Sequence, residues 1–385
     1  MVGMSRLERP MPHALNEKPA VLMVADLGSS ASKVFYRVGG GSTLPLWMGA
    51  EVAPNLSQSV LTQFRGSNRP QDSAWLELGD QVVLVGESAK TCLESNSIRA
   101  NKSELAAYKI AAALGVVAEL ESLPPSFEAM VWLALPLTEL GTRDAIRTQV
   151  EAICQGGFRF RGEPLQVNLT MKAFPEGFGL YLNRKGELDA VGQDINQRRS
   201  LIVMMGHRNL SVLCFDGGSL RAAGSNSNGP GFWPMFEKAA RSAGVTQPDY
   251  GFLMAAIASD QPQQLSVARG RLFDFSEPMT ACLDTYWQAV LTYWQDQVMP
   301  QLEAVNTEVI ISGGASSILR SRLSAYFTEL GLSQRVLFTE GGPRRLEALV
   351  RGLPESAQIP SMTLRMADSY GLFRGLIGTL DSVAV

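Results

Sequence analysis

One acid at the end of an apolar run constrains the fold of this chain most. In the segment AVLMVADLGSSASKVFYRV, Asp26 follows the apolar run directly, and a second strand-like run begins at Lys33. Glycine lets a ligand approach the backbone, and the N–H groups and hydroxyls of small residues can bind an anion. We therefore predict a hairpin whose turn binds phosphate. An ordinary hairpin turn is the alternative, because Asp, Gly and Ser are common turn residues.

The composition bounds the class of protein. At 385 residues the chain exceeds what a single core usually fills, so we expect two lobes. Apolar residues make up 45% and charged residues 18%, as in ordinary globular proteins. The net charge of −3 argues against a strongly basic nucleic-acid binder, and we expect no direct sequence-specific DNA binding. No apolar run approaches the roughly 18 residues of a membrane helix, so no membrane partner is expected.

The cysteines, histidines and N-terminal residues indicate a cytoplasmic protein. The four cysteines lie far apart and form no Cys-x-x-Cys pair, and with two histidines we expect no zinc site. Scattered thiols suit a reducing interior. Residues 1–19 lack the pattern of a secretory signal, and we expect a flexible polar lead-in there.

Hydrophobic patterning predicts an α/β fold, because strands and helices interleave. Apolar runs predict strands over residues 21–26, 33–38, 44–51, 82–86, 128–135, 200–205, 210–215, 308–312 and 335–338. Segments 167–173 and 178–183 flank a turn at 175–177. Helices are predicted over 102–120, from a Thr138 cap to 154, and over 231–242, 249–259, 277–305, 316–330 and 367–379. The predicted lobes are 20–195 and 196–385, with helix 367–379 packing back on the first lobe.

Two later turns repeat the form of the first. Gly206-His207-Arg208-Asn209 follows the run LIVMM, and Gly313-Gly314 stands where the strand VIIS passes into a helix. A helix N-terminus favours anionic groups. The P-loop motif Gly-x-x-x-x-Gly-Lys-Ser/Thr is absent, and no Gly-x-Gly-x-x-Gly opens a helix, so P-loop and Rossmann folds are disfavoured. Each of the three turns is therefore a candidate phosphate-binding turn.

This order of turns resembles the actin / Hsp70 / sugar kinase superfamily, and shorter segments resemble its ParM-like plasmid-segregation actins and their archaeal relatives. VVLVGESAK is similar to the Val-Gly-Glu-x-Ala segment of these proteins, and LALPLTEL resembles their Gly-Leu-Pro-Leu strand end. FPEGFGLYL resembles the turn that holds their catalytic acid or amide, and ADSYGLFRGL their closing helix. The resemblance covers about residues 21–378 and implies an actin-like fold with mixed sheets and a nucleotide in the interlobe cleft.

The resemblance also implies roles for individual residues. Asp26 would hold Mg²⁺ through coordinated waters, Lys33 would reach the β- and γ-phosphates, and Glu176 would orient the attacking water. His207 is a further catalytic candidate. The remaining residues expected to bind nucleotide are Gly28, Ser29, Ser30 and Ser32 in the first turn, Gly206, His207, Arg208 and Asn209 in the second, and Gly313, Gly314 and Ala315 beside the adenine and ribose.

One position departs from the family pattern. The family usually has an aspartate immediately before the glycine that Gly206 matches, and here that position is Met205. Methionine cannot hold a magnesium-bound water. Three alternatives follow: Asp26 and Glu176 suffice, His207 and Arg208 take over part of the task, or hydrolysis is slow or absent and the nucleotide acts as a binding switch.

The function implied by the resemblance is that of an ATPase that forms nucleotide-dependent filaments in plasmid or DNA segregation. The expected cofactors are ATP or ADP with Mg²⁺, and the expected partners are further copies of the chain and a DNA-bound adaptor protein. A small-molecule kinase of the same superfamily and a nucleotide-binding scaffold with little hydrolysis are the alternatives.

Overall fold

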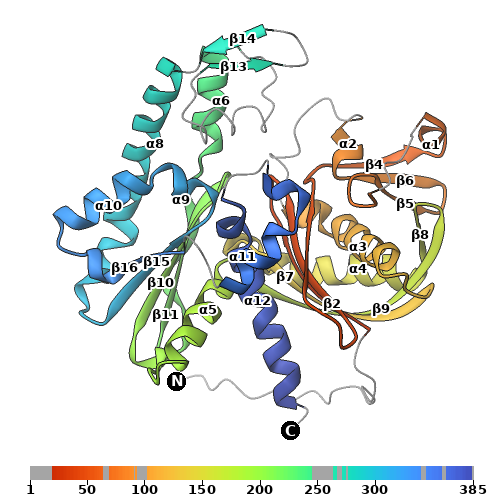
Figure 1. Cartoon of the computed structure of the whole chain (residues 1–385), viewed down its shortest axis with the longest axis horizontal. Helices are drawn as coiled ribbons and strands as arrows, with labels where there is room; N and C mark the ends of the chain where they lie inside the picture. Colours follow the sequence, from red (N-terminus) through yellow and green to blue (C-terminus); the bar gives the residue numbers. More distant parts are fainter. Residues whose placement is uncertain are drawn as a thin grey trace.

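The computed structural model describes residues 20–63, 69–90, 92, 102–244, 263–266, 271–274, 276–339, 344–357 and 361–383. Within these ranges, two large β-sheets lie beside each other with helices on their faces (Figure 1). No helix in the described part of the chain is both long and apolar enough to span a membrane. The α/β class and the two-lobed arrangement agree with the prediction. The predicted lead-in at 1–19 and the predicted helix 249–259 lie outside the described residues.

The first sheet carries nine described strands in the order β3-β2-β1-β7-β9-β8-β5-β6-β4. Their bounds are β1 Val21–Leu27, β2 Ser32–Val38, β3 Leu44–Met48, β4 Val52–Ser57, β5 Ala74–Leu78, β6 Gln81–Val85, β7 Ser126–Leu135, β8 Phe158–Phe160 and β9 Glu163–Pro175. β1 pairs antiparallel with β2 and parallel with β7. The associated helices are α1 Val60–Gln63, α2 Glu87–Lys90, α3 Lys102–Leu120, η2 Leu137–Thr142, α4 Arg143–Gly156, α5 Phe178–Asp189 and η3 Ile195–Gln197.

The second sheet has five described strands in the order β12-β11-β10-β15-β16. Their bounds are β10 Arg199–Met205, β11 Asn209–Asp216, β12 Ser219–Pro230, β15 Thr307–Ser312 and β16 Val336–Phe338. A separate hairpin pairs β13 Gln263–Ser266 with β14 Arg271–Asp274. The helices of this half are α6 Trp233–Ser242, α8 Ser276–Gln297, η4 Met299–Glu303, α9 Gly314–Ile318, α10 Arg320–Glu329, η5 Ser333–Arg335, α11 Arg344–Arg351, η6 Pro354–Ala357 and α12 Met362–Val383.

Strand alternation sends side chains of each sheet into two different cores. In β1, Met23 packs in the cluster with α3 and α4, whereas Val24 packs in a central cluster with α11 and α12. In β10, Val203 packs in the cluster with α6 and α8, whereas Ile202 joins the central cluster. The central cluster therefore joins the inner faces of both sheets, and the next inward-facing position on β1 is Asp26.

The helices α5 and α12 form the middle of the molecule (Figure 1). They approach closely at Gly179, where a Cβ would lie 1.9 Å from the Asp368 carbonyl oxygen. α12 also contacts β1, β2 and β7 of the first sheet. Only a residue without a side chain permits this distance between two helix backbones.

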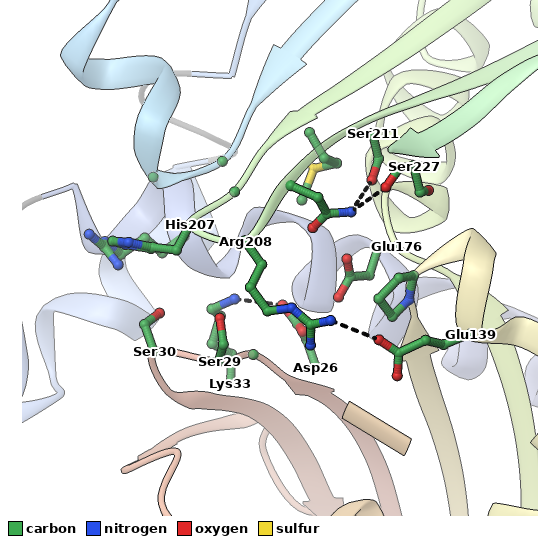
Figure 2. A pocket seen from close by; sticks show the side chains of 18 of the residues that line it. Asp26, Ser29, Ser30, Lys33, Glu139, Glu176, His207, Arg208, Ser211 and Ser227 are labelled. Carbon is green, nitrogen blue, oxygen red and sulfur yellow. Dashed lines mark hydrogen bonds and ion pairs between the residues drawn. The ribbon is translucent and has the colours of Figure 1, made fainter. Parts of the chain in front are cut away.

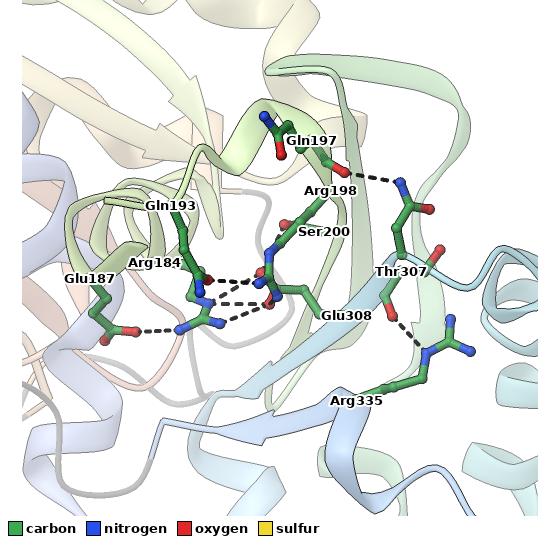
Figure 3. A network of polar contacts seen from close by, with 10 residues as sticks. Arg184, Glu187, Gln193, Gln197, Arg198, Ser200, Thr307, Glu308 and Arg335 are labelled. Atoms are coloured by element: carbon green, nitrogen blue, oxygen red, sulfur yellow. Dashed lines mark hydrogen bonds and ion pairs between the residues drawn. The ribbon is translucent and has the colours of Figure 1, made fainter. Parts of the chain in front are cut away.

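The buried Glu308 connects α5 to the start of the second sheet (Figure 3). Arg184 of α5 donates from Nη2 to Glu308 Oε2 at 3.0 Å, and Ser200 of β10 donates from Oγ to Glu308 Oε1 at 3.1 Å. Arg198 adds a longer contact of 3.5 Å to Oε2. These bonds satisfy a carboxylate that would be costly to bury alone.

Several predicted helix boundaries change in the structure. Thr138 does not cap a helix, because residues 137–142 form η2 and α4 begins at Arg143. Residues 178–183 belong to α5. The predicted helix 277–305 ends as α8 at Gln297, before η4, and the predicted helix 316–330 is divided at Leu319 between α9 and α10.

Candidate functional site

A pocket of about 190 Å³ lies where the turns of the two sheets face each other (Figure 2). It brings together all three turns predicted from the sequence, together with the turn after β9. The predicted residues that line it are Asp26, Gly28, Ser29, Ser30, Lys33, Glu176, Gly206, His207, Arg208, Asn209, Gly313 and Gly314. Two predicted residues are not in the lining, because Ser32 and Ala315 are buried, each 1% exposed.

The first turn presents a charged pair to the pocket. Lys33 Nζ donates to Asp26 Oδ2 at 2.6 Å, and the two residues are cross-strand partners in the β1–β2 ladder. A Cβ at Gly28 would lie 2.7 Å from the Ala31 carbonyl oxygen and 3.1 Å from Lys33 Nζ. Glycine is therefore required for this turn to fold back on itself beside the lysine.

The second turn is braced by hydrogen bonds to its own strands. The Gly206 N–H donates to the Asn209 carbonyl at 2.9 Å, and Asn209 Nδ2 donates to Ser211 Oγ at 3.1 Å and to the Ser227 carbonyl at 2.9 Å. Asn209 thus holds the turn in shape. His207 lies in the pocket lining, and burial, followed by the charges of Arg365 and Lys33, lowers its pKa to about 3. His207 is therefore a neutral imidazole at ordinary pH.

The two methionines that precede Gly206 face opposite sides of β10. Met205 is fully buried in the core of the second sheet, whereas Met204 lines the pocket. Met204 precedes Gly206 by two residues, just as Asp26 precedes Gly28, and both face the centre of the molecule. Met205 therefore does not face the pocket, and Met204 is the methionine of β10 that lines it.

The third turn requires glycine at its first position. Gly313 has φ of 95°, and a Cβ there would lie 2.4 Å from the Met205 carbonyl oxygen. A Cβ on Gly314 would lie 3.2 Å from the Arg365 Cζ. Arg365 comes from α12, lines the pocket and has its pKa lowered by burial. The turn therefore places backbone, not side chains, on this wall of the pocket.

Glu176 reaches the pocket from the turn between β9 and α5. Its N–H donates to the Leu135 carbonyl at 2.8 Å. Asp368 of α12 caps α5, since Oδ2 accepts from the Gly177 N–H at 2.8 Å and Oδ1 from the Leu180 N–H at 3.2 Å. Burial raises the pKa of Asp368 to about 6. The backbone that carries Glu176 is thus held on both sides.

Sequence reasoning missed part of the pocket. The unpredicted lining residues are Pro136, Thr138, Glu139, Met204, Ser211, Ser227 and Arg365. Glu139 lies within the segment LALPLTEL, which resembles a strand end of the family, so this segment could have indicated it. Arg365 had no such signal, because it lies just before the segment recognised as the closing helix.

The side chains fit a magnesium ion held mainly by water and phosphate. Among the described residues, no group of three or more His, Cys, Asp or Glu side chains could hold a metal ion by itself. Asp26 is 3% exposed and faces the pocket beside the turn that would hold phosphate. Mg²⁺ commonly uses one or two carboxylates, several waters and phosphate oxygens. One carboxylate in this position meets that requirement.

No protein-family model and no curated protein sequence matches the chain, whereas solved structures match nearly all of it. A pCBH ParM non-polymerisable quadruple mutant has a TM-score of 0.63 at 13% identity, covering 92% of this chain and 98% of that chain. An archaeal actin homolog in complex with ADP has a TM-score of 0.59 at 15% identity, covering 92% and 99%. An Alp12 filament structure has a TM-score of 0.56 at 11% identity, covering 94% and 99%. The chain has a ParM-like, two-lobed actin fold.

Proposed function

We propose that this chain binds ATP or ADP with Mg²⁺ in the pocket between its sheets. One observation carries the proposal: three glycine-containing turns from both sheets converge on one pocket that also contains Asp26 and Glu176. The ADP complex of the archaeal actin homolog supports it, because that protein has the same fold. ATP and ADP present the polyphosphate that such turns suit.

Each charged residue of the pocket has a distinct part in the proposal. Asp26 orients the waters of the metal ion, and Lys33, already placed beside it, faces the phosphates. When bound, Mg²⁺ neutralises charge on the phosphate oxygens. Ser29 and Ser30 supply further donors at the first turn, and the backbone at Gly313 leaves room for the nucleoside.

We further propose slow ATP hydrolysis in which Glu176 orients the attacking water. A water-positioning group must accept a hydrogen bond close to the terminal phosphate, and Glu176 lies in the same pocket as the phosphate turns. Met204 offers no oxygen where a second acid would help, so Glu176 acts without that support. His207 is neutral at ordinary pH and is proposed as a hydrogen-bonding group for phosphate, not as a cation.

The proposed role of this cycle is filament assembly in DNA segregation, with a DNA-bound adaptor. Support comes from the Alp12 filament structure, which shares the fold. A nucleotide between two lobes can bias their relative angle and so change contacts between subunits. Cys154, Cys214 and Cys282 are buried free thiols, which fits our proposal of a cytoplasmic location.

The test combines light scattering with phosphate release. Right-angle scattering of the wild type is expected to rise with Mg-ATP and to rise less with ADP. Asp26→Ala is expected to lose magnesium-dependent turnover, and Glu176→Ala to retain ATP binding while phosphate release falls at least about tenfold. Asp80→Ala, at an exposed turn between β5 and β6, is the matched control. Flat scattering with phosphorylation of a small molecule would identify a kinase instead, and full turnover in Asp26→Ala would remove that residue from the site.

A further inference from the structure

An ion pair spans the pocket between elements of the two sheets. Arg208 Nη2 lies 3.7 Å from Glu139 Oε1 (Figure 2). Arg208 belongs to the turn between β10 and β11, and Glu139 belongs to η2, which follows β7. η2 also contacts β12 of the second sheet, so the pair lies where the two halves of the molecule meet.

Glu139 is held firmly on its own side of the pocket. Its Oε2 accepts a hydrogen bond from the Ser103 N–H at 2.9 Å, at the start of α3. Its backbone N–H donates to the Pro136 carbonyl at 2.9 Å, and its carbonyl accepts from Thr142 Oγ1 at 2.7 Å. One carboxylate oxygen is therefore fixed against α3, while the other faces Arg208 across the pocket.

Arg208 is the more adaptable partner of the pair. Its side chain is 31% exposed, against 11% for Glu139, and the 3.7 Å separation is longer than a charge-assisted hydrogen bond of about 2.7–2.9 Å. Figure 2 shows the Arg208 side chain pointing into the pocket, toward the side that carries Asp26 and Lys33. A guanidinium in this position can turn from Glu139 toward an anion bound at the first turn.

We propose that Glu139 is a positioning residue that holds Arg208 when the γ-phosphate is absent and releases it when a nucleoside triphosphate binds. This inference rests on the proposed nucleotide site. A terminal phosphate carries more negative charge than one carboxylate and accepts two parallel hydrogen bonds from a guanidinium. Because a diphosphate lacks the γ-phosphate, Arg208 stays with Glu139 when a diphosphate is bound. Arg208 therefore has two arrangements, one on Glu139 and one on the bound phosphate. A triphosphate binds the second arrangement more tightly and a diphosphate does not, so the position of Arg208 distinguishes the two nucleotides.

Glu139→Gln tests this competition without removing the contact to α3. Glutamine keeps an oxygen that can accept from the Ser103 N–H, but it has no charge to attract Arg208. In isothermal titration calorimetry with Mg²⁺, affinity for a non-hydrolysable ATP analogue is expected to rise about fivefold, the size expected of one partly exposed ion pair. Affinity for ADP is expected to change less than about twofold. Glu163→Gln, at an exposed site on β9, should leave both affinities unchanged.

A double-mutant cycle locates the effect at Arg208. Arg208→Gln is expected to weaken binding of the triphosphate more than that of ADP, and adding Glu139→Gln to it should produce no further gain. Equal shifts for both nucleotides, weaker triphosphate binding in Glu139→Gln, or the same gain without Arg208 would overturn the inference. A wild type that binds neither nucleotide would refute the nucleotide site and this inference together. A wild type that binds both, with an unchanged affinity ratio in Glu139→Gln, would refute this inference alone.

Discussion

Replacing Asp368 by asparagine removes a buried negative charge from the N-terminus of α5. The carboxylate is 3% exposed and accepts hydrogen bonds from the Gly177 and Leu180 N–H groups. Burial raises its pKa to about 6, and the charge of Asp26 adds to the effect, while the two N–H donors and the charge of Lys33 oppose it. The energetic cost of ionising buried Asp368 is therefore larger than the stabilisation that the two N–H donors and Lys33 give to its charged form.

The direction of the resulting pH dependence follows from the two pKa values. An ordinary aspartate in the unfolded chain has a pKa of 3.8, against about 6 for Asp368 in the folded protein. Between these values the folded state binds the proton more tightly, so stability from this group is complete below pH 3.8 and is lost as the pH rises through 6. At about 1.4 kcal/mol for each pKa unit, the loss amounts to about 3 kcal/mol.

Urea unfolding of the wild type and Asp368→Asn at pH 4 to 7 measures this loss. Asparagine does not titrate and offers one oxygen to two donors, so the variant loses a hydrogen bond of about 1 kcal/mol at every pH. The unfolding free energy of the wild type minus that of the variant is expected to fall by about 2.4 kcal/mol from pH 4 to pH 7, which is most of the total loss. Asp80→Asn, at an exposed site, should follow the wild type. Parallel curves for the wild type and Asp368→Asn would refute the reasoning.

Two further predictions concern α5 and the second turn. Gly179→Ala would place a Cβ 1.9 Å from the Asp368 carbonyl oxygen, so we expect about 3 kcal/mol or more of destabilisation in thermal unfolding. Gly186→Ala on the same helix meets only the tip of an arginine side chain, at 3.5 Å, and serves as the control; equal melting temperatures would contradict the packing argument. Because burial and two nearby cations lower the pKa of His207 to about 3, His207→Gln should leave the shape of the pH profile of ATP turnover between pH 5 and 8 unchanged. An inflection near pH 6.5 that disappears in the variant would show instead that His207 titrates there.

Local pattern was sufficient to predict the elements that carry the turns. The strands that end near Asp26 and Gly206 and the strand before Gly313 appear where their apolar runs indicated. A short apolar run and the glycine after it are properties of neighbouring residues, so they can be recognised without the rest of the chain. The predicted convergence of these turns on one pocket came from the family resemblance and agrees with the geometry.

Two features of the structure depend on more than nearest neighbours. Thr138 has the residue type of a helix cap, but the chain first forms η2 and starts α4 at Arg143. Met205 stands next to the turn glycine, yet strand alternation directs Met204 into the pocket. The same alternation governs Asp26 on β1.

By itself the sequence determined the strands that carry the three turns, where those strands turn, and which small residues leave backbone open to an anion, because these depend on local chemistry. Only the tertiary structure decided which charged groups meet: Arg208 with Glu139, Asp368 with the N-terminus of α5, and Arg365 with Gly314. The Asp368 contact to Gly177 joins residues 191 positions apart. Such contacts arise when whole sheets and helices pack, and their energies depend on burial that no local pattern specifies.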